Sequence, residues 1–130
     1  MRKTAQMTKH EHDLEQRTLI FAKSVLRLCK RLPVDIVNRE TVSQLIRSSG
    51  LAGTNYRETN DALSRKDFNH RVKITRKEAK ETEYWLELLR EGNPGHEREI
   101  DMLPSESIEL RKILSSIADK ATRVMLEAVH

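Results

Sequence analysis

The sequence contains few of the residues that turn-rich, all-β folds need. Aromatic residues make up 4% of its 130 residues, and there are only four glycines and three prolines. Sandwiches and barrels require many turns, which are built largely from Gly, Pro, Asn and Asp. Charged residues, in contrast, reach 34%. This composition is typical of long amphipathic helices joined by short connections, and it predicts an all-α protein.

Cysteines and long apolar runs are also scarce. Cys29 is the only cysteine, so no internal disulfide can form, and its apolar neighbours indicate a small buried hydrophobic residue. No apolar run approaches the roughly 18 residues that a membrane span needs. Residues 1–13 are basic and then mixed in charge, without the apolar region of a secretory signal. We therefore expect a cytoplasmic protein that does not enter a membrane.

Apolar residues recur with the period of an α-helix in several segments of the chain. The predicted helices cover about residues 13–32, 36–63, 65–91 and 105–129. Mostly short connections between them favour antiparallel neighbours, so we expect an up-and-down antiparallel four-helix bundle. Residues 13–130 are predicted to form this single domain, and residues 1–12 a flexible N-terminal arm.

Helix boundaries are marked by capping and breaking residues. Pro33 ends the first predicted helix, and Asp35 and Asn38 are candidate caps for the second. Ser64 and Asp67 have the spacing of a capping box at the start of the third helix.

The middle of the second helix allows two interpretations. Gly50 and Gly53 lower helix propensity, so the helix can break there, or these small residues can let a neighbouring backbone approach closely. Because the apolar phase continues without a slip through Tyr56 to Leu63, we favour one helix, straight or bent.

The third predicted helix carries a row of cations opposite its apolar seam. Between residues 64 and 80 there are seven Lys or Arg and two acids. The row, here called the basic stripe, comprises Arg65, Lys66, Lys73, Arg76, Lys77 and Lys80. Its lysines span about 21 Å at 1.5 Å per residue. The stripe is either a solvated helix face or a surface for nucleic-acid phosphates. No aromatic residue is interleaved, so stacking on bases is not indicated.

A second group of apolar residues lies outside the main seam of this helix. An apolar band of Ile74, Tyr84, Trp85 and Leu88 is either the edge of a wide core or an oligomer interface, which is the interpretation we favour.

Arg71 and Glu78 fall at the edge of the seam, where ionised groups need partners. We expect a polar network that fixes helix register. The candidate partners on the preceding helix are Asn55, Arg57 and Glu58.

No set of residues indicates catalysis or a cofactor. Di-iron bundles use two Glu-x-x-His pairs, and the only match here is Glu127 with His130 at the last residue of the sequence. A glycine-rich phosphate loop and an activated nucleophile are not apparent. We therefore expect no enzyme, no metal site and no cofactor.

Residues 45–89 resemble a known family. The likeness is carried by residues 45–49 (LIRSS), 55–58 (NYRE), 64–68 (SRKDF) and 77–89 (KEAKETEYWLELL). These segments are similar to bacterial four-helix bundle proteins encoded within intervening sequences of large-subunit ribosomal RNA genes. The resemblance implies a homopentameric ring without known enzymatic activity. A related branch resembles the accessory proteins of diversity-generating retroelements, basic pentamers that associate with a reverse transcriptase and with nucleic acid.

Two hypotheses about function follow. In the first, the chain is a non-catalytic oligomer that binds RNA or DNA, or serves as a ribonucleoprotein accessory protein, which the resemblance extends to assisting a reverse transcriptase. Within the resemblance, the basic start of the third helix corresponds to Arg65 and Lys66. In the alternative, the chain is a protein-interaction scaffold whose basic face docks an acidic protein partner.

Overall fold

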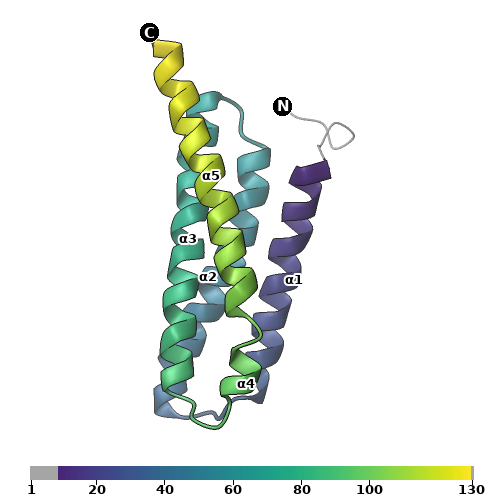
Figure 1. The fold of residues 1–130 in the computed structure, drawn as a ribbon, viewed down its shortest axis with the longest axis vertical. Helices are drawn as coiled ribbons and strands as arrows, with labels where there is room; N and C mark the ends of the chain where they lie inside the picture. The colour runs from purple at the N-terminus through teal and green to yellow at the C-terminus, as the bar shows by residue number, and fades with distance from the viewer. Residues whose placement is uncertain (1–8, 130) are drawn as a thin grey trace.

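The computed structural model describes residues 9–129 and contains only helices within that range. Its elements are α1 (Lys9–Arg31), α2 (Ile36–Asn60), α3 (Arg65–Glu91), α4 (Glu97–Ile100) and α5 (Pro104–Val129). The four long helices run alternately down and up the molecule, with the short α4 at one end (Figure 1). This arrangement confirms the predicted all-α, antiparallel four-helix bundle. No helix in the described range is both long and apolar enough to cross a membrane.

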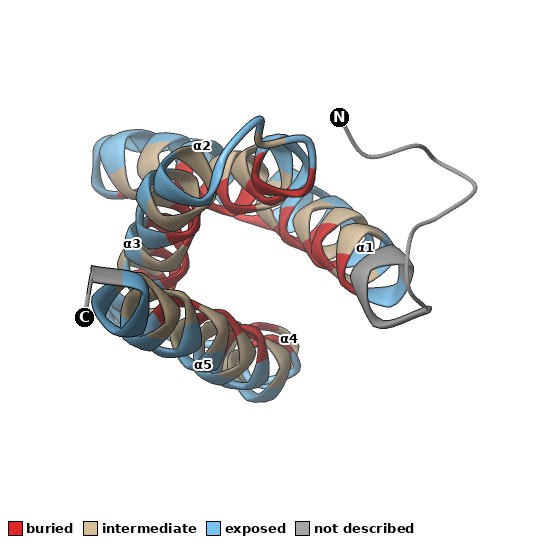
Figure 2. Ribbon diagram, turned by 90° about the horizontal axis from the view of Figure 1, so that it is seen from above, coloured by how far each residue is buried: buried red, intermediate tan, exposed pale blue. Residues whose placement is uncertain are grey.

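Three of the four pairs of neighbouring helices pack closely. α2 packs against α1 and α3, and α3 packs against α5, whereas α1 and α5 make few contacts with each other. Seen along the bundle, the backbones of α1 and α5 lie farther apart than those of the other neighbouring helices (Figure 2). Arg17 of α1 links these two helices by donating two hydrogen bonds to the Glu106 carboxylate, at 2.8 and 3.1 Å.

The core is aliphatic and draws on every long helix. Its most buried large side chains are Leu14, Val25, Leu28, Leu45, Val72, Leu89 and Leu114, each at most 2% exposed. Small hydroxyl side chains lie between these leucines. Thr82 of α3, for example, donates a hydrogen bond to Ser48 of α2 at 3.0 Å. Such paired hydroxyl groups let α2 and α3 pack closely without leaving unsatisfied polar atoms.

α2 is a single helix through both of its glycines, as favoured from the sequence. A Cβ atom on Gly53 would lie 3.3 Å from the Thr18 Oγ1 atom of α1, whereas one on Gly50 would meet nothing within 4 Å. Gly53 therefore serves the close approach of α1 to α2, and Gly50 does not.

Two of the three predicted caps are present, at Asp35 and Ser64, whereas Asn38 lies inside α2 and is not its cap. The Asp35 carboxylate accepts a hydrogen bond from the Asn38 N–H at 2.9 Å and starts α2. Ser64 accepts from the Asp67 N–H at 3.0 Å and starts α3. Asp67 in turn accepts from the Leu63 N–H at 3.3 Å.

Some helix boundaries differ from the prediction. α2 ends at Asn60 rather than residue 63, because the chain turns there to place Leu63 beside Asp67. α1 already begins at Lys9, within the predicted N-terminal arm of residues 1–12, and residues 1–8 of that arm lie outside the described residues.

The connection before the last helix contains the short α4, which the sequence analysis did not predict. Ile100 is fully buried and Leu103 is 8% exposed, so this segment covers one end of the core. The apolar spacing of these two residues is helical, but four residues are too few to establish a period.

Candidate nucleic-acid interface

The lysines of the basic stripe lie on the solvent side of α3. Lys66, Lys73, Lys77 and Lys80 are all exposed, and none forms an ion pair with another residue of the described range. They return to one side because they repeat at three-, four- and seven-residue intervals along a straight helix. Their charges are therefore available to an external anion along about 21 Å of the surface.

The two arginines of the stripe differ from each other. Arg65 is exposed at the start of α3. Arg76 is half-buried and donates to the Asp119 carboxylate of α5 at 3.3 Å. Arg76 thus joins α3 to α5, and its charge is largely compensated within the protein. The structure places five of the six predicted cations on the open surface and gives the sixth an acidic neighbour.

α5 adds cations that the sequence analysis missed. An open hollow of about 490 Å³ lies on this helix beside the Arg76–Asp119 pair. Its lining residues are Arg111, Lys112, Ser115, Ser116, Asp119 and Arg123. Arg111 is engaged by Glu83 of α3 at 2.7 Å, while Lys112 and Arg123 are exposed. Only the packing of α5 on α3 brings these cations to the same side as the stripe, so the α3 sequence carried no signal for them.

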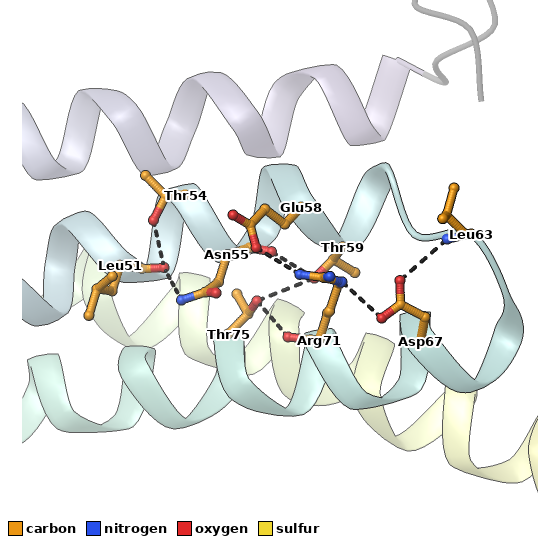
Figure 3. Close-up of polar contacts among 9 residues, drawn as sticks. All are labelled: Leu51, Thr54, Asn55, Glu58, Thr59, Leu63, Asp67, Arg71 and Thr75. Atoms are coloured by element: carbon orange, nitrogen blue, oxygen red, sulfur yellow. Dashed lines mark hydrogen bonds and ion pairs between the residues drawn. The ribbon is translucent and has the colours of Figure 1, made fainter. Parts of the chain in front are cut away.

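A polar seam between α2 and α3 holds the start of the basic stripe in place (Figure 3). Arg71 donates to Asp67 of its own helix at 2.9 Å and to Glu58 of α2 at 2.7 Å. The Arg71 guanidinium lowers the pKa of the Asp67 carboxyl, since it stabilises the ionised form. Deeper in the seam, the hydroxyl groups of Thr59 and Thr75 lie 3.4 Å apart. The predicted register-fixing network is confirmed for Arg71, with Glu58 as its partner on α2.

Glu78 was expected to join that network and does not pair there. It is 7% exposed, and its Oε1 atom has no hydrogen-bond partner among the described residues. Burial raises the pKa of this carboxyl above its ordinary value of 4.5, with the negative charge of Glu81 as the next cause.

For the Oε1 atom of Glu78, the expected pairing with Asn55, Arg57 or Glu58 was wrong, because these residues bind other groups. Arg57 lies 4.0 Å from Glu15, and Glu58 accepts from Arg71. Asn55 donates to the Leu51 carbonyl oxygen at 2.9 Å.

The predicted apolar band divides into an inner and an outer part. Trp85 packs against the core and Ile74 is half-buried, which matches the edge of a wide core. Tyr84 is 58% exposed and Leu88 is 41% exposed. The Tyr84 ring meets the Trp85 ring edge-on, with centroids 5.1 Å apart. Within this band, only Tyr84 and Leu88 therefore present a substantial apolar surface to a partner.

Among the residues that the structure describes, no metal-binding cluster is found. No cluster of three or more His, Cys, Asp or Glu side chains able to hold a metal ion occurs in the described part of the chain. His130, half of the di-iron half-motif, lies outside that part. Cys29 is half-buried rather than fully buried, and burial raises the pKa of its thiol to about 11. A thiol with this pKa is a poor nucleophile at neutral pH.

Comparisons with known proteins agree with the architecture. The profile of the family described as "23S rRNA-intervening sequence protein" matches residues 10–116. A 1.70 Å crystal structure of a protein with unknown function from the S23 ribosomal protein family of Bacteroides thetaiotaomicron is similar, with a TM-score of 0.68 and 35% identity. The alignment covers 81% of this chain and 97% of that one. No curated protein matches significantly.

The profile match spans α1 through the first half of α5, and it includes the polar seam and the whole basic stripe. It also agrees with the resemblance carried by residues 45–89. The chain belongs to the family of 23S rRNA-intervening sequence proteins.

Proposed function

We propose that this protein is a non-catalytic, self-associating accessory protein that binds RNA or DNA through the basic stripe of α3. One observation carries the proposal. Four exposed lysines stand in a row without an ion-pair partner in the described range, although acidic residues are abundant elsewhere on the molecule. Uncompensated cations spaced along a rigid rod can neutralise successive phosphates and release their counterions on binding.

The surface favours phosphate contacts over base recognition. Phe68 is the one aromatic residue between the first and last of these lysines in the sequence, and its helical phase places it on the opposite side of α3; Tyr84 lies beyond Lys80. Exposed cations on α5, at Lys112 and Arg123, extend the positive region beside the stripe. We therefore propose binding that depends strongly on salt and weakly on sequence. The family resemblance supports two further parts of the proposal, a pentameric ring and an association with a reverse transcriptase.

The test is a binding titration with fluorescently labelled RNA and DNA, single- and double-stranded, at low salt. The doubly reversed variant Lys73→Glu, Lys77→Glu should lose at least about tenfold in affinity, because each reversal replaces a phosphate contact with repulsion. A matched control reverses two exposed cations at the other end of the bundle, where α2 begins and α4 lies (Figure 1), Arg39→Glu and Arg98→Glu.

The control protein, assayed at the same subunit concentration, should bind much more tightly than the stripe variant. If the wild-type protein binds none of the four probes at low salt, nucleic-acid binding is wrong. The alternatives of an acidic protein partner for the basic face and of a solvated helix face would survive that result.

A further inference from the structure

The molecule carries two exposed surfaces of opposite charge, each of which includes apolar side chains that the fold leaves uncovered. One lies on the outer side of α1 and the other on the outer side of the C-terminal half of α3. Seen along the bundle, these helices occupy opposite sides, separated by α2 and α5 (Figure 2). We propose that the α1 surface of one copy binds the α3 surface of a second copy.

The outer side of α1 is apolar and basic. Ile20 is 58% exposed and Leu26 is 47% exposed, and both lie away from the core face formed by Leu14 and Val25. At about 100° per residue, three exposed cations lie between Ile20 and Leu26 around the helix. The surface that we call the α1 patch is formed by Ile20, Lys23, Leu26, Arg27 and Lys30. It extends over about 15 Å of helix.

The charge of the α1 patch is not compensated within the subunit. Residues 16–31 contain five cations and no acid. Arg17 and Arg31 are occupied by Glu106 and Glu99, at 2.8 and 3.2 Å. Lys23, Arg27 and Lys30 form no ion pair with any residue in the described range.

The outer side of α3 changes character along its length. Its N-terminal half carries the basic stripe, whereas residues 81–91 contain four acids and one cation. Glu83 and Arg90 are occupied by residues of the last third of the chain, Arg111 and Asp101, each at 2.7 Å. Glu87 and Glu91 are exposed and make no ion pair within the described range.

These two acids flank the exposed apolar residues of the same helix face. Together they form what we call the α3 patch, made of Tyr84, Glu87, Leu88 and Glu91. The patch extends over about 10 Å of helix, comparable to the α1 patch.

A second copy of the chain fits both patches better than other partners do. Phosphates would satisfy the cations of α1 but would leave Ile20 and Leu26 against a polar surface. A basic surface with exposed apolar side chains at its edges matches a surface that combines exposed apolar side chains with acidic ones, and the α3 patch has that composition. Because the patches lie on opposite sides, each copy can bind two others, head to tail. Such heterologous contacts generate a ring when the rotation closes.

The inference rests on the self-association in the proposed function and specifies its contact surfaces. The test measures molar mass by light scattering and sedimentation, at micromolar concentrations in about 0.1 M salt, where charges act over about 10 Å. One variant reverses the α1 patch (Lys23→Glu, Arg27→Glu) and another reverses the α3 patch (Glu87→Lys, Glu91→Lys). A third combines all four changes and so restores opposite charges across the contact.

We expect the wild-type protein to be a closed oligomer. Each single-patch variant should weaken association by about tenfold or more, and the combined variant should regain the wild-type mass. The control is the stripe variant Lys73→Glu, Lys77→Glu, which makes the same charge change as the α1 variant and should assemble normally. Circular dichroism should show unchanged folding, because every altered residue is exposed.

Three results would overturn the inference. A monomeric wild-type protein would remove both the self-association and its surfaces. Single-patch variants that assemble like the wild type would show that the contact lies elsewhere. A combined variant that stays dissociated while folded would show that the two patches do not face each other. Nucleic-acid binding is scored separately with the stripe variant, so failure of one proposal does not decide the other.

Discussion

Asn38 and Asn93 donate side-chain hydrogen bonds to each other, at 2.7 and 2.8 Å, although they are 55 residues apart in sequence. Each amide also donates to a backbone carbonyl oxygen, Asn38 to Pro33 at 2.9 Å and Asn93 to Leu89 at 2.7 Å. Both side chains are 3% exposed. The pair therefore joins the turn between α1 and α2 to the end of α3.

Removing either amide should destabilise the protein by about 1–3 kcal/mol, because the other is left buried without its partner. We expect Asn38→Ala and Asn93→Ala to lower the free energy of unfolding in urea accordingly. The double variant should cost less than the sum of the two. Gln44→Ala is a matched control, since the Gln44 amide bonds to Glu40 on the exposed surface and its loss should cost less than about 0.5 kcal/mol. Additive costs at the two asparagines would contradict direct coupling.

The two glycines of α2 should respond differently to alanine. In the interior of a helix, Ala is more favourable than Gly by about 1 kcal/mol of helix-forming free energy. Gly50→Ala should realise most of this gain as higher thermal stability, because its Cβ would meet nothing within 4 Å. Gly53→Ala should gain much less or lose stability, because its Cβ would press on Thr18 at 3.3 Å. Equal gains at both positions would refute the close approach of α1 at Gly53.

The contribution of Glu78 to the free energy of unfolding should be smaller at neutral pH than at acid pH. Its pKa is raised by burial, so the folded state binds the proton more tightly than the unfolded chain does. Its contribution to stability therefore falls as pH rises from about the ordinary value of 4.5 to the raised pKa, and stays low above it. We expect Glu78→Gln to stabilise the protein by about 1 kcal/mol at pH 7 and by little near pH 4.

Urea titrations across this pH range measure the difference between Glu78→Gln and the wild type. The exposed substitution Glu109→Gln serves as the control and should give a small difference at every pH. A pH-independent effect of Glu78→Gln would show that the charge of Glu78 is not the cause.

The stripe lysines should contribute more than Arg76 to the salt dependence of nucleic-acid binding. Each phosphate contact contributes about 0.7–0.9 to the slope of log K against log salt concentration. Lys73→Gln with Lys77→Gln should therefore lower the magnitude of the slope by about 1.4–1.8. Arg76→Gln should change it less, because Asp119 already compensates that charge at 3.3 Å. A larger change for Arg76 than for one lysine would mean that Arg76 leaves Asp119 to bind phosphate.

Much of the architecture followed from local sequence. The caps at Asp35 and Ser64 and the 3.6-residue periodicity depend on groups three or four residues apart, so they predicted α2 and α3 to within three residues at either end. The basic stripe followed for the same reason. α4 was not predicted, because its four residues are too few to show a hydrophobic period. Its Ile100 is buried because the segment covers one end of the core.

The tertiary structure alone decided which charges remain available. Arg76 and Lys77 are adjacent in sequence, yet Arg76 faces Asp119 of α5 and Lys77 faces solvent. Glu78 was expected to find a partner, and its Oε1 atom has none in the described range. Hydrophobic period indicates which side of a helix is buried, but not which residue of another helix stands opposite. That depends on how α2, α3 and α5 are arranged side by side, and the available charges of this surface follow from that arrangement.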